Sequence, residues 1–145
     1  MPILNYTTSI DAYKSAAEVQ GVLAKAGANS VSIDYENGAP SALSFAIVYL
    51  EHPIHFRLPC NAEGVLKALV KSNKVPRSQR TIDQARRVAW RIIKAWVEAQ
   101  LAIVESQQAQ MTEVFLPYVV AENGQTMFAA FTESKQKQLA AGNPQ

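Results

Sequence analysis

The chain of 145 residues is about half apolar and 18% charged, a composition typical of a folded globular domain and not of a disordered segment. Its single cysteine excludes an internal disulfide and zinc sites built on cysteine pairs, and its apolar runs are too short to span a membrane. The formal net charge is +2, but residues 67–94 contain nine lysines and arginines and only one acid. Positive charge is therefore concentrated in one region of an otherwise acidic chain.

The first 27 residues predict a strand followed by a helix. β-forming residues dominate 3–10, which favours a strand. Ser15 and Glu18 have the spacing of a capping box, and apolar residues follow at helical spacing. Gly27 is suited to the left-handed residue that ends such a helix.

The next 32 residues predict an antiparallel hairpin and a third strand. Apolar and polar residues alternate on both sides of Asn37-Gly38, the strongest short signal for a hairpin turn. Pro40 follows closely, so we expect the connecting loop to be longer than two residues. Residues 54–58 predict a third antiparallel strand, which Pro59 ends.

Two helices are predicted in the middle of the chain. Asn61 is a good N-cap for the first. A loop over 73–80 carries three cations, and Thr81 and Gln84 then form a second capping box. This capping box opens a long helix over 82–108, which at 1.5 Å per residue measures about 40 Å.

The C-terminal part is ambiguous between a hairpin and a helix. Residues 115–121 suggest an edge strand, because Pro117 cannot donate to a central ladder. Thr126 would cap a last helix, and residues 141–145 are expected to fray. We therefore predict a single α+β domain over 1–140. Its antiparallel sheet has about three to five strands, packed by one long helix and two or three shorter ones.

The long helix carries a wide apolar arc. Arg87, Arg91 and Lys94 lie opposite this arc and are expected to be exposed, with Trp90 at its edge and Gln100 within it. One interpretation is that the apolar arc packs in the core and the opposite, polar face of the helix is exposed to solvent. The other is that part of the arc forms the seam of a symmetric dimer. A turn carbonyl is the expected partner for the Gln100 amide.

Catalytic and metal-binding motifs are scarce. His52, His55 and Cys60 would form at best a poor three-ligand site, and glycine-rich phosphate loops and nucleophile elbows are absent. The sequence therefore favours a binding protein over an enzyme, with no cofactor and no metal. It also shows no basic segment followed by an apolar one at its start, so a cytoplasmic location is expected.

The segments "VAWRIIKAWVEAQLAIVE" and "EVFLPYVV", the latter followed by "ENGQTMF", resemble a family of short uncharacterised proteins from phages and prophages. "SALSFAIV" and "IHFRLP" resemble that family as well, so the likeness covers most of the chain. It supplies no assigned site. The resemblance implies a phage accessory protein, a class whose small non-enzymatic members often act by binding.

These observations lead to three functional hypotheses. The first is sequestration of a small anionic ligand, such as a nucleotide immune signal of the host, by a homodimer or higher oligomer. The second is nucleic-acid binding in phage replication or recombination. The third is inhibition of a host defence or CRISPR protein. For phosphate recognition the candidate residues are Arg57, Arg77, Arg80, Arg86, Arg87 and Arg91, with Trp90 for stacking and Gln100 for polar contact.

Overall fold

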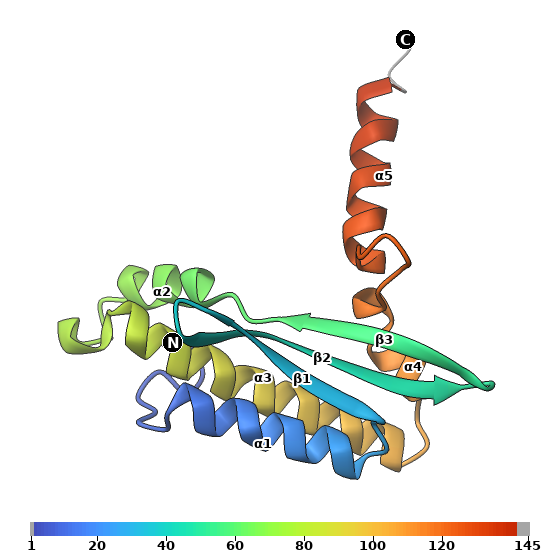
Figure 1. Ribbon diagram of the computed structural model, residues 1–145. Coiled ribbons are helices and arrows are strands. Elements are labelled where there is room, and N and C mark those ends of the chain that lie inside the picture. Colours follow the sequence, from blue (N-terminus) through green and yellow to red (C-terminus); the bar gives the residue numbers. More distant parts are fainter. Residues whose placement is uncertain (1, 142–145) are drawn as a thin grey trace.

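The computed structural model describes residues 2–141, which form a three-stranded antiparallel sheet with two of the helices packed along one of its faces (Figure 1). The sheet has the strand order β1-β2-β3, and α1 and α3 run side by side beneath it. The α+β prediction is confirmed. In chain order the elements are α1 (Ala12–Lys25), β1 (Ser30–Glu36), β2 (Ala39–Tyr49), β3 (His52–Pro59), α2 (Ala62–Lys71), the 3-10 turn η1 (Arg77–Gln79), α3 (Ile82–Glu105), α4 (Met111–Val114), the 3-10 turn η2 (Leu116–Tyr118) and α5 (Met127–Ala141).

The predicted hairpin is present, but its loop is shorter than expected. Asn37 and Gly38 form a two-residue turn and both have positive φ, at 52° and 77°. This conformation is the one that Asn-Gly adopts at least cost. Pro40 is accommodated within β2, where the register shifts opposite Asp34 and Tyr35 instead of the loop lengthening.

The expected N-terminal strand is wrong. Residues 4–7 are turns, and Asn5 has a positive φ of 65°. The buried amide of Gln84 donates hydrogen bonds to the carbonyls of Tyr6, at 3.0 Å, and Thr8, at 2.8 Å. These bonds replace a strand ladder and fix the segment against the start of α3.

Helix α1 begins three residues before the predicted capping box. Asp11 is the N-cap, and its carboxylate accepts from the backbone N–H of Tyr13 at 2.7 Å. Ser15 is instead a buried residue inside the helix. The predicted end is confirmed: Gly27 has φ 109°, and Ala28 N–H donates back to the carbonyl of Leu23.

The main core lies between the sheet and the helices. The rings of Phe45 on β2 and Phe56 on β3 are stacked with their centroids 4.7 Å apart. Phe115 meets Phe45 edge-on at 5.5 Å. Trp90 and Val97 of α3 complete this cluster, and all five side chains are buried.

The caps of the middle helices agree with the sequence. Asn61 accepts from Gly64 N–H at 2.9 Å, and Thr81 accepts from Gln84 N–H at 3.1 Å. Only half of the second capping box forms, because the Gln84 amide is bonded to the N-terminal segment. Helix α3 ends at Glu105, three residues earlier than predicted.

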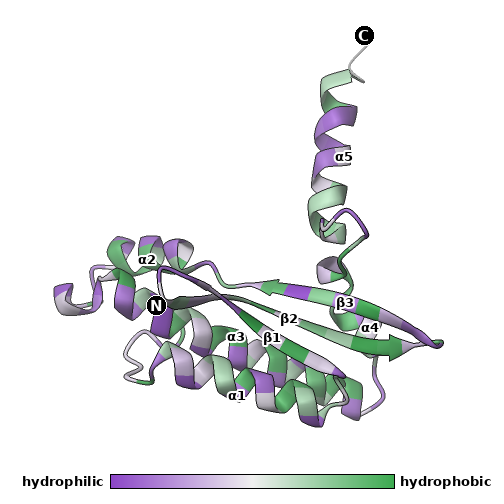
Figure 2. Cartoon of the chain, viewed as in Figure 1, coloured by the Kyte–Doolittle hydropathy of each residue, from purple (hydrophilic) through white to green (hydrophobic). Residues whose placement is uncertain are grey.

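In the C-terminal part, where the sequence was ambiguous between a hairpin and a helix, the structure shows a helix, α5. The expected edge strand over 115–121 is replaced by η2 and two isolated bridges, Phe56 to Val119 and Val120 to Thr126. Thr126 caps α5, accepting from Ala129 N–H at 3.1 Å, as predicted. Helix α5 then stands away from the body, on the side of the sheet opposite α1 and α3 (Figures 1 and 2). Of the tail expected to fray, Ala141 belongs to α5, and residues 142–145 lie outside the described residues.

None of the helices within residues 2–141 combines the length and the apolar character needed to cross a membrane.

Candidate anion-binding surface

Four exposed cations lie on α2 and the loop that follows it, and we call them the basic ridge: Lys67, Lys71, Lys74 and Arg77. Lys67 and Lys71 are one turn apart on the same face of α2. The opposite face of α2 is apolar, and its buried Leu69 packs with Val75 and Ala85. Because the apolar face of α2 packs in the core, the two lysines on the other face point to solvent. No ion pair involving the ridge is found among residues 2–141.

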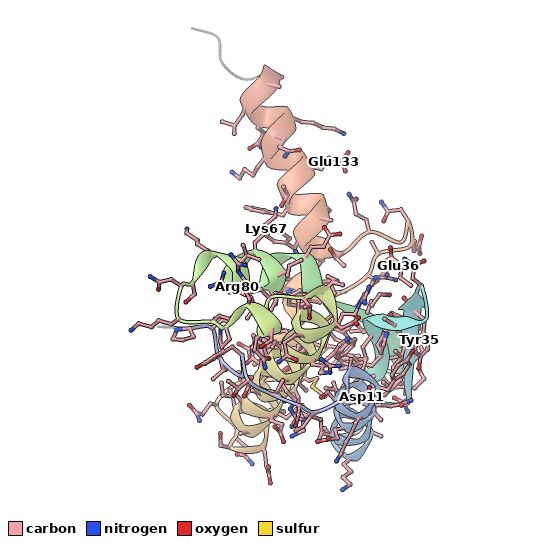
Figure 3. The ribbon with its side chains drawn as sticks, turned by 90° about the vertical axis from the view of Figure 1, so that its left-hand side faces the viewer. Asp11, Tyr35, Glu36, Lys67, Arg80 and Glu133 are labelled. Atoms are coloured by element: carbon pink, nitrogen blue, oxygen red, sulfur yellow. The ribbon has the colours of Figure 1, made fainter. Side chains whose placement is uncertain are left out.

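The loop that carries Lys74 and Arg77 is braced from below. Val75 is fully buried, so its side chain anchors the loop in the smaller core cluster. The guanidinium of Arg80 donates to the carbonyl of Val75 at 2.9 Å and to that of Ser72 at 3.2 Å. Figure 3 shows Lys67 and Arg80 on neighbouring elements at the same end of the molecule. Arg80 thus holds the loop in shape through bonds within the chain.

Arg86 and Arg87, predicted to bind phosphate, are at the start of α3. Each is bonded to a side chain three residues earlier in the same helix. Arg86 pairs with Asp83 at 2.9 Å. Arg87 donates to the side-chain oxygen of Gln84 at 2.9 Å. Neither side chain is fully exposed, since Arg86 retains about a third of its surface. The expectation of an exposed Arg87 is therefore wrong.

Arg91 and Lys94 also differ from the prediction, because they lie in the contact between α1 and α3 instead of on a solvated back. Only 16% of each side chain is exposed. Arg91 donates to the hydroxyl of Ser15 at 3.1 Å and to the carboxylate of Glu18 at 3.3 Å. Lys94 lies 3.5 Å from Glu18 and 3.1 Å from Glu98. The face of α3 that looked polar is thus covered by α1.

The carboxylate of Glu18 responds to these neighbours. Desolvation by itself would raise its pKa, but the hydrogen bond from Arg91 and the positive charges of Arg91 and Lys94 outweigh that effect. The pKa of Glu18 is therefore held below its ordinary value of 4.5. This ion-pair network stabilises the packing of two helices and leaves little of Arg91 available to a ligand.

Trp90 and Gln100 have structural partners as well. Trp90 is completely buried, and its indole N–H donates to the carbonyl of Pro40 at 3.0 Å. Its ring cannot stack on a ligand from this position, so the stacking role is wrong. The amide of Gln100 reaches the carbonyl of Val114 in α4 at 3.5 Å, in line with the expected turn carbonyl.

Arg57 is on the sheet and not on α2 or the loop that carries the basic ridge. Its neighbours Phe56 and Leu58 on β3 point into the core, so Arg57 projects from the opposite face of the sheet. There it pairs with Asp34 of β1 at 3.0 Å across the middle strand. The six candidate arginines therefore do not converge, and only Arg77 belongs to the basic ridge.

Hollows in the described surface carry no excess of positive charge. A cavity of about 260 Å³ beside the β1–β2 turn is lined by Arg86 together with Glu36 and Glu63. A second of about 270 Å³ places Arg86 and Arg87 beside Asp11 and Asp83. The acids offset the arginines in both, which makes neither cavity a strong anion site.

Two kinds of catalytic group, a reactive thiol and a three-ligand metal site, are not found within residues 2–141. Burial raises the pKa of the Cys60 thiol to about 12, so it stays protonated at neutral pH and is a poor nucleophile. No three histidine, cysteine or acidic side chains of the described chain are grouped to hold a metal ion.

Sequence reasoning placed Lys67, Lys71 and Lys74 in the basic segment that could converge on an anion, but it left them out of the candidates for phosphate recognition. It favoured arginines because their planar groups suit bidentate phosphate contacts. The signal that could have identified the lysines was the absence of any acid between Lys67 and Asp83, which leaves Lys71 and Lys74 without an acidic partner within one helical turn; Lys67 has Glu63 four residues earlier but makes no ion pair with it within residues 2–141.

Known proteins supply no further guide: no protein family, curated protein or solved structure matches the chain.

Proposed function

We propose that the protein is a non-enzymatic nucleic-acid-binding protein that holds the phosphate backbone on its basic ridge. The observation that carries this proposal is the set of four exposed cations, Lys67, Lys71, Lys74 and Arg77, which make no ion pair within residues 2–141. The likeness to phage and prophage proteins suggests that the role is an accessory one in replication or recombination.

The shape of the surface favours a polyanion over a small ligand. The ridge follows one side of α2 and continues along the braced loop, and it is not enclosed by a cavity. Lys67 and Lys71 are about 6 Å apart on their helix face. Separate cations spread over an open surface neutralise successive phosphates, whereas a small anion is held best by donors that converge.

The surroundings of the ridge favour contact with the backbone over base recognition. Of the aromatic residues on the strands, Tyr35 and Tyr49 are exposed, but both are on the sheet and not on α2 or its loop. Tyr35 is moreover stacked on Tyr13 of α1, with centroids 6.0 Å apart. Contacts from lysine to phosphate carry no sequence information, so we expect binding that is independent of sequence.

Binding is tested by fluorescence anisotropy with a labelled 30-base-pair duplex and a labelled 30-nucleotide single strand. Affinity should fall with salt, with a log–log slope of about −3.6 for the duplex or about −2.8 for the single strand if all four cations contact phosphate. The variant Lys67→Glu, Lys71→Glu should abolish binding. A matched control, Lys14→Glu, Lys25→Glu, makes the same change of charge at exposed lysines on α1 and should bind better than the ridge variant.

Absence of binding at about 50 mM salt, for both probes, would contradict the proposal, because phosphate contacts are strongest at low ionic strength. Equal loss in the ridge variant and the control would also contradict it, since the effect would then follow net charge and not the ridge.

Sequestration of a small nucleotide is the second candidate, and the observation in its favour is that Arg86 lines both cavities beside the β1–β2 turn. Thermal denaturation with a panel of cyclic and ADP-ribose-type nucleotides tests it, since tight binding raises the melting temperature. Arg86→Ala should remove any such shift. A shift that survives this substitution would place the ligand elsewhere.

A further inference from the structure

Exposed large apolar side chains are concentrated on two protrusions of the molecule. One is the apolar arm, which we define as Met127, Phe128, Phe131 and Leu139 of α5. The other is the hairpin tip, formed by Val48 and Tyr49 at the end of β2 and Leu50 in the turn to β3. Phe128 and Phe131 each keep 59% of their surface exposed, and Leu50 keeps 76%. A monomeric protein rarely exposes so many large apolar groups together.

Helix α5 has little to pack against in its own chain. Its main contacts within residues 2–141 are with η2, and none of its residues is buried. An isolated helix of 15 residues is marginal in water, so most of its stability must come from packing. The four side chains of the arm lie within about a third of the helix circumference, at the spacing of a packing face. Lys135 and Gln138 share this third of the helix, so the unpartnered apolar surface is mainly that of Met127, Phe128 and Phe131 at the start of α5.

The hairpin tip is held in a costly conformation. Leu50 and Glu51 form the two-residue turn with φ of 50° and 68°, the left-handed region in which leucine is rare. The same sheet turns at Asn37-Gly38 with residues suited to that geometry. A strained backbone that presents an exposed leucine is an observation that points to function.

We infer that the chain forms a dimer through these two protrusions. The hairpin tip of each copy lies on the apolar arm of the other copy. Such an exchange is the isologous contact of a two-fold dimer, in which both patches are used twice. The charges agree with this pairing. Lys135 lies within the arm, 5.9 Å from the ring centroid of Phe131, and Glu51 lies at the exposed tip.

The apolar area of the two patches approaches that of a stable dimer interface. Covering the exposed parts of all seven large side chains, three of them aromatic and four aliphatic or methionine, would bury at most roughly 700 Å² per copy. A standard interface buries about 800 Å² per partner. Direct pairing of two antiparallel α5 helices about their centres is less favourable, because it brings the two Lys135 ammonium groups together.

The contact leaves the proposed nucleic-acid surface free. The hairpin tip and α2 are at opposite ends of the sheet (Figure 1). The sequence suggested that a dimer seam could form along the long helix, α3. In this arrangement the seam would instead be formed by α5 and the hairpin tip.

The test uses the full chain in sedimentation velocity over 1–100 µM, with a charge exchange at Glu51 and Lys135. Wild type should sediment as a dimer, with twice the monomer mass of 15.9 kDa. Glu51→Lys or Lys135→Glu alone should raise the dissociation constant roughly tenfold, because each turns two attractive pairs into repulsions. The double variant Glu51→Lys, Lys135→Glu should restore association, and this restoration identifies the pairing of tip and arm.

Two further variants test the apolar contact. Phe131→Asp should give a monomer, whereas Leu4→Asp, a control at an equally exposed leucine outside both patches, should leave the dimer intact. A wild-type monomer at 100 µM would overturn the inference, and so would a dimer that persists in Phe131→Asp. Circular dichroism of each variant shows whether the fold is retained. The charge variants, at exposed positions, keep the test valid if Phe131→Asp fails to fold.

Discussion

The guanidinium of Arg91 lies 3.3 Å from the carboxylate of Glu18, and this ion pair joins α3 to α1 across 73 positions of sequence. Both partners are shielded from solvent, with 16% and 33% of their side chains exposed. The same guanidinium donates to the buried hydroxyl of Ser15. A cation that the helical pattern placed in solvent is thus part of the structural core of the helix layer.

Charge reversal at the contact between α1 and α3 should lower the stability of the whole fold and not only remove a binding site. In Arg87→Glu, Arg91→Glu, a new carboxylate would face Glu18, and the amide of Gln84 and the hydroxyl of Ser15 would lose their donors. We expect a lower urea midpoint by circular dichroism. Lys67→Glu, Lys71→Glu makes the same charge change at exposed residues and should lower the midpoint much less, because like charges on a helix surface cost only a few tenths of a kcal/mol per pair. Equal midpoints for the two variants would contradict the structural role of the arginines.

Stability should depend on acid pH through Glu18. Its pKa is lower in the folded protein than its ordinary value of 4.5, so the folded state binds its proton more weakly than the unfolded state does. The stabilisation is therefore complete above pH 4.5 and is lost as the pH falls through the folded pKa. Urea midpoints measured from pH 6 to pH 3 should fall in wild type and fall less steeply in Glu18→Gln.

Glu133 supplies the matched control for this titration. Hydrogen bonds from Gln125 and Lys137, and the charge of Lys137, also lower its pKa, but it lies on α5, away from the core. Glu133→Gln should therefore retain the wild-type pH dependence of global unfolding. If Glu18→Gln retains it as well, the ion pair with Arg91 is not the source of the effect.

Replacing Trp90 by phenylalanine should cost roughly 3 kcal/mol of unfolding free energy. The smaller ring leaves a cavity in the main core and leaves the buried carbonyl of Pro40 without its donor at 3.0 Å. Trp96→Phe should cost less, since Trp96 is only partly buried and contacts Phe115 and Tyr118 through its ring. Urea unfolding of the two variants measures the difference. A larger loss for Trp96→Phe would show that the bond to Pro40 contributes little.

Replacing the turn at the hairpin tip should change two quantities in opposite directions, raising the stability of the monomer and lowering the affinity of the dimer. Replacing Leu50-Glu51 by Asn-Gly puts favoured residues in the left-handed turn and should stabilise the monomer by about 1 kcal/mol. The same change removes Leu50, the most exposed apolar side chain of the tip, together with the charge of Glu51, and should weaken the dimer. Urea unfolding at low concentration and sedimentation at 100 µM measure the two effects. A loss of stability would mean that the leucine is not strained there.

Most features that depend on residues a few positions apart were predictable from the sequence, the capping box at Ser15 and Glu18 being an exception. The caps at Asn61, Thr81 and Thr126 follow from side chains that bond the next turn of their own helix. The turn at Asn37-Gly38 follows from the torsion angles that these two residues tolerate. In each case the cause and its consequence lie within one turn of the chain.

Burial of the long helix was decided by elements distant in sequence, which the helical pattern of α3 cannot reveal. Trp90 is at the edge of the apolar arc, yet it is fully buried because it packs in the main core, where the carbonyl of Pro40 accepts from its indole N–H. Arg91 is opposite the arc, yet it is covered because α1 brings Glu18 over it. The ridge of Lys67 and Lys71 stays in solvent because no such element packs against that face within residues 2–141. A sequence specifies which side chains carry charge, but only the packing of distant elements decides which of those charges remain available to a partner.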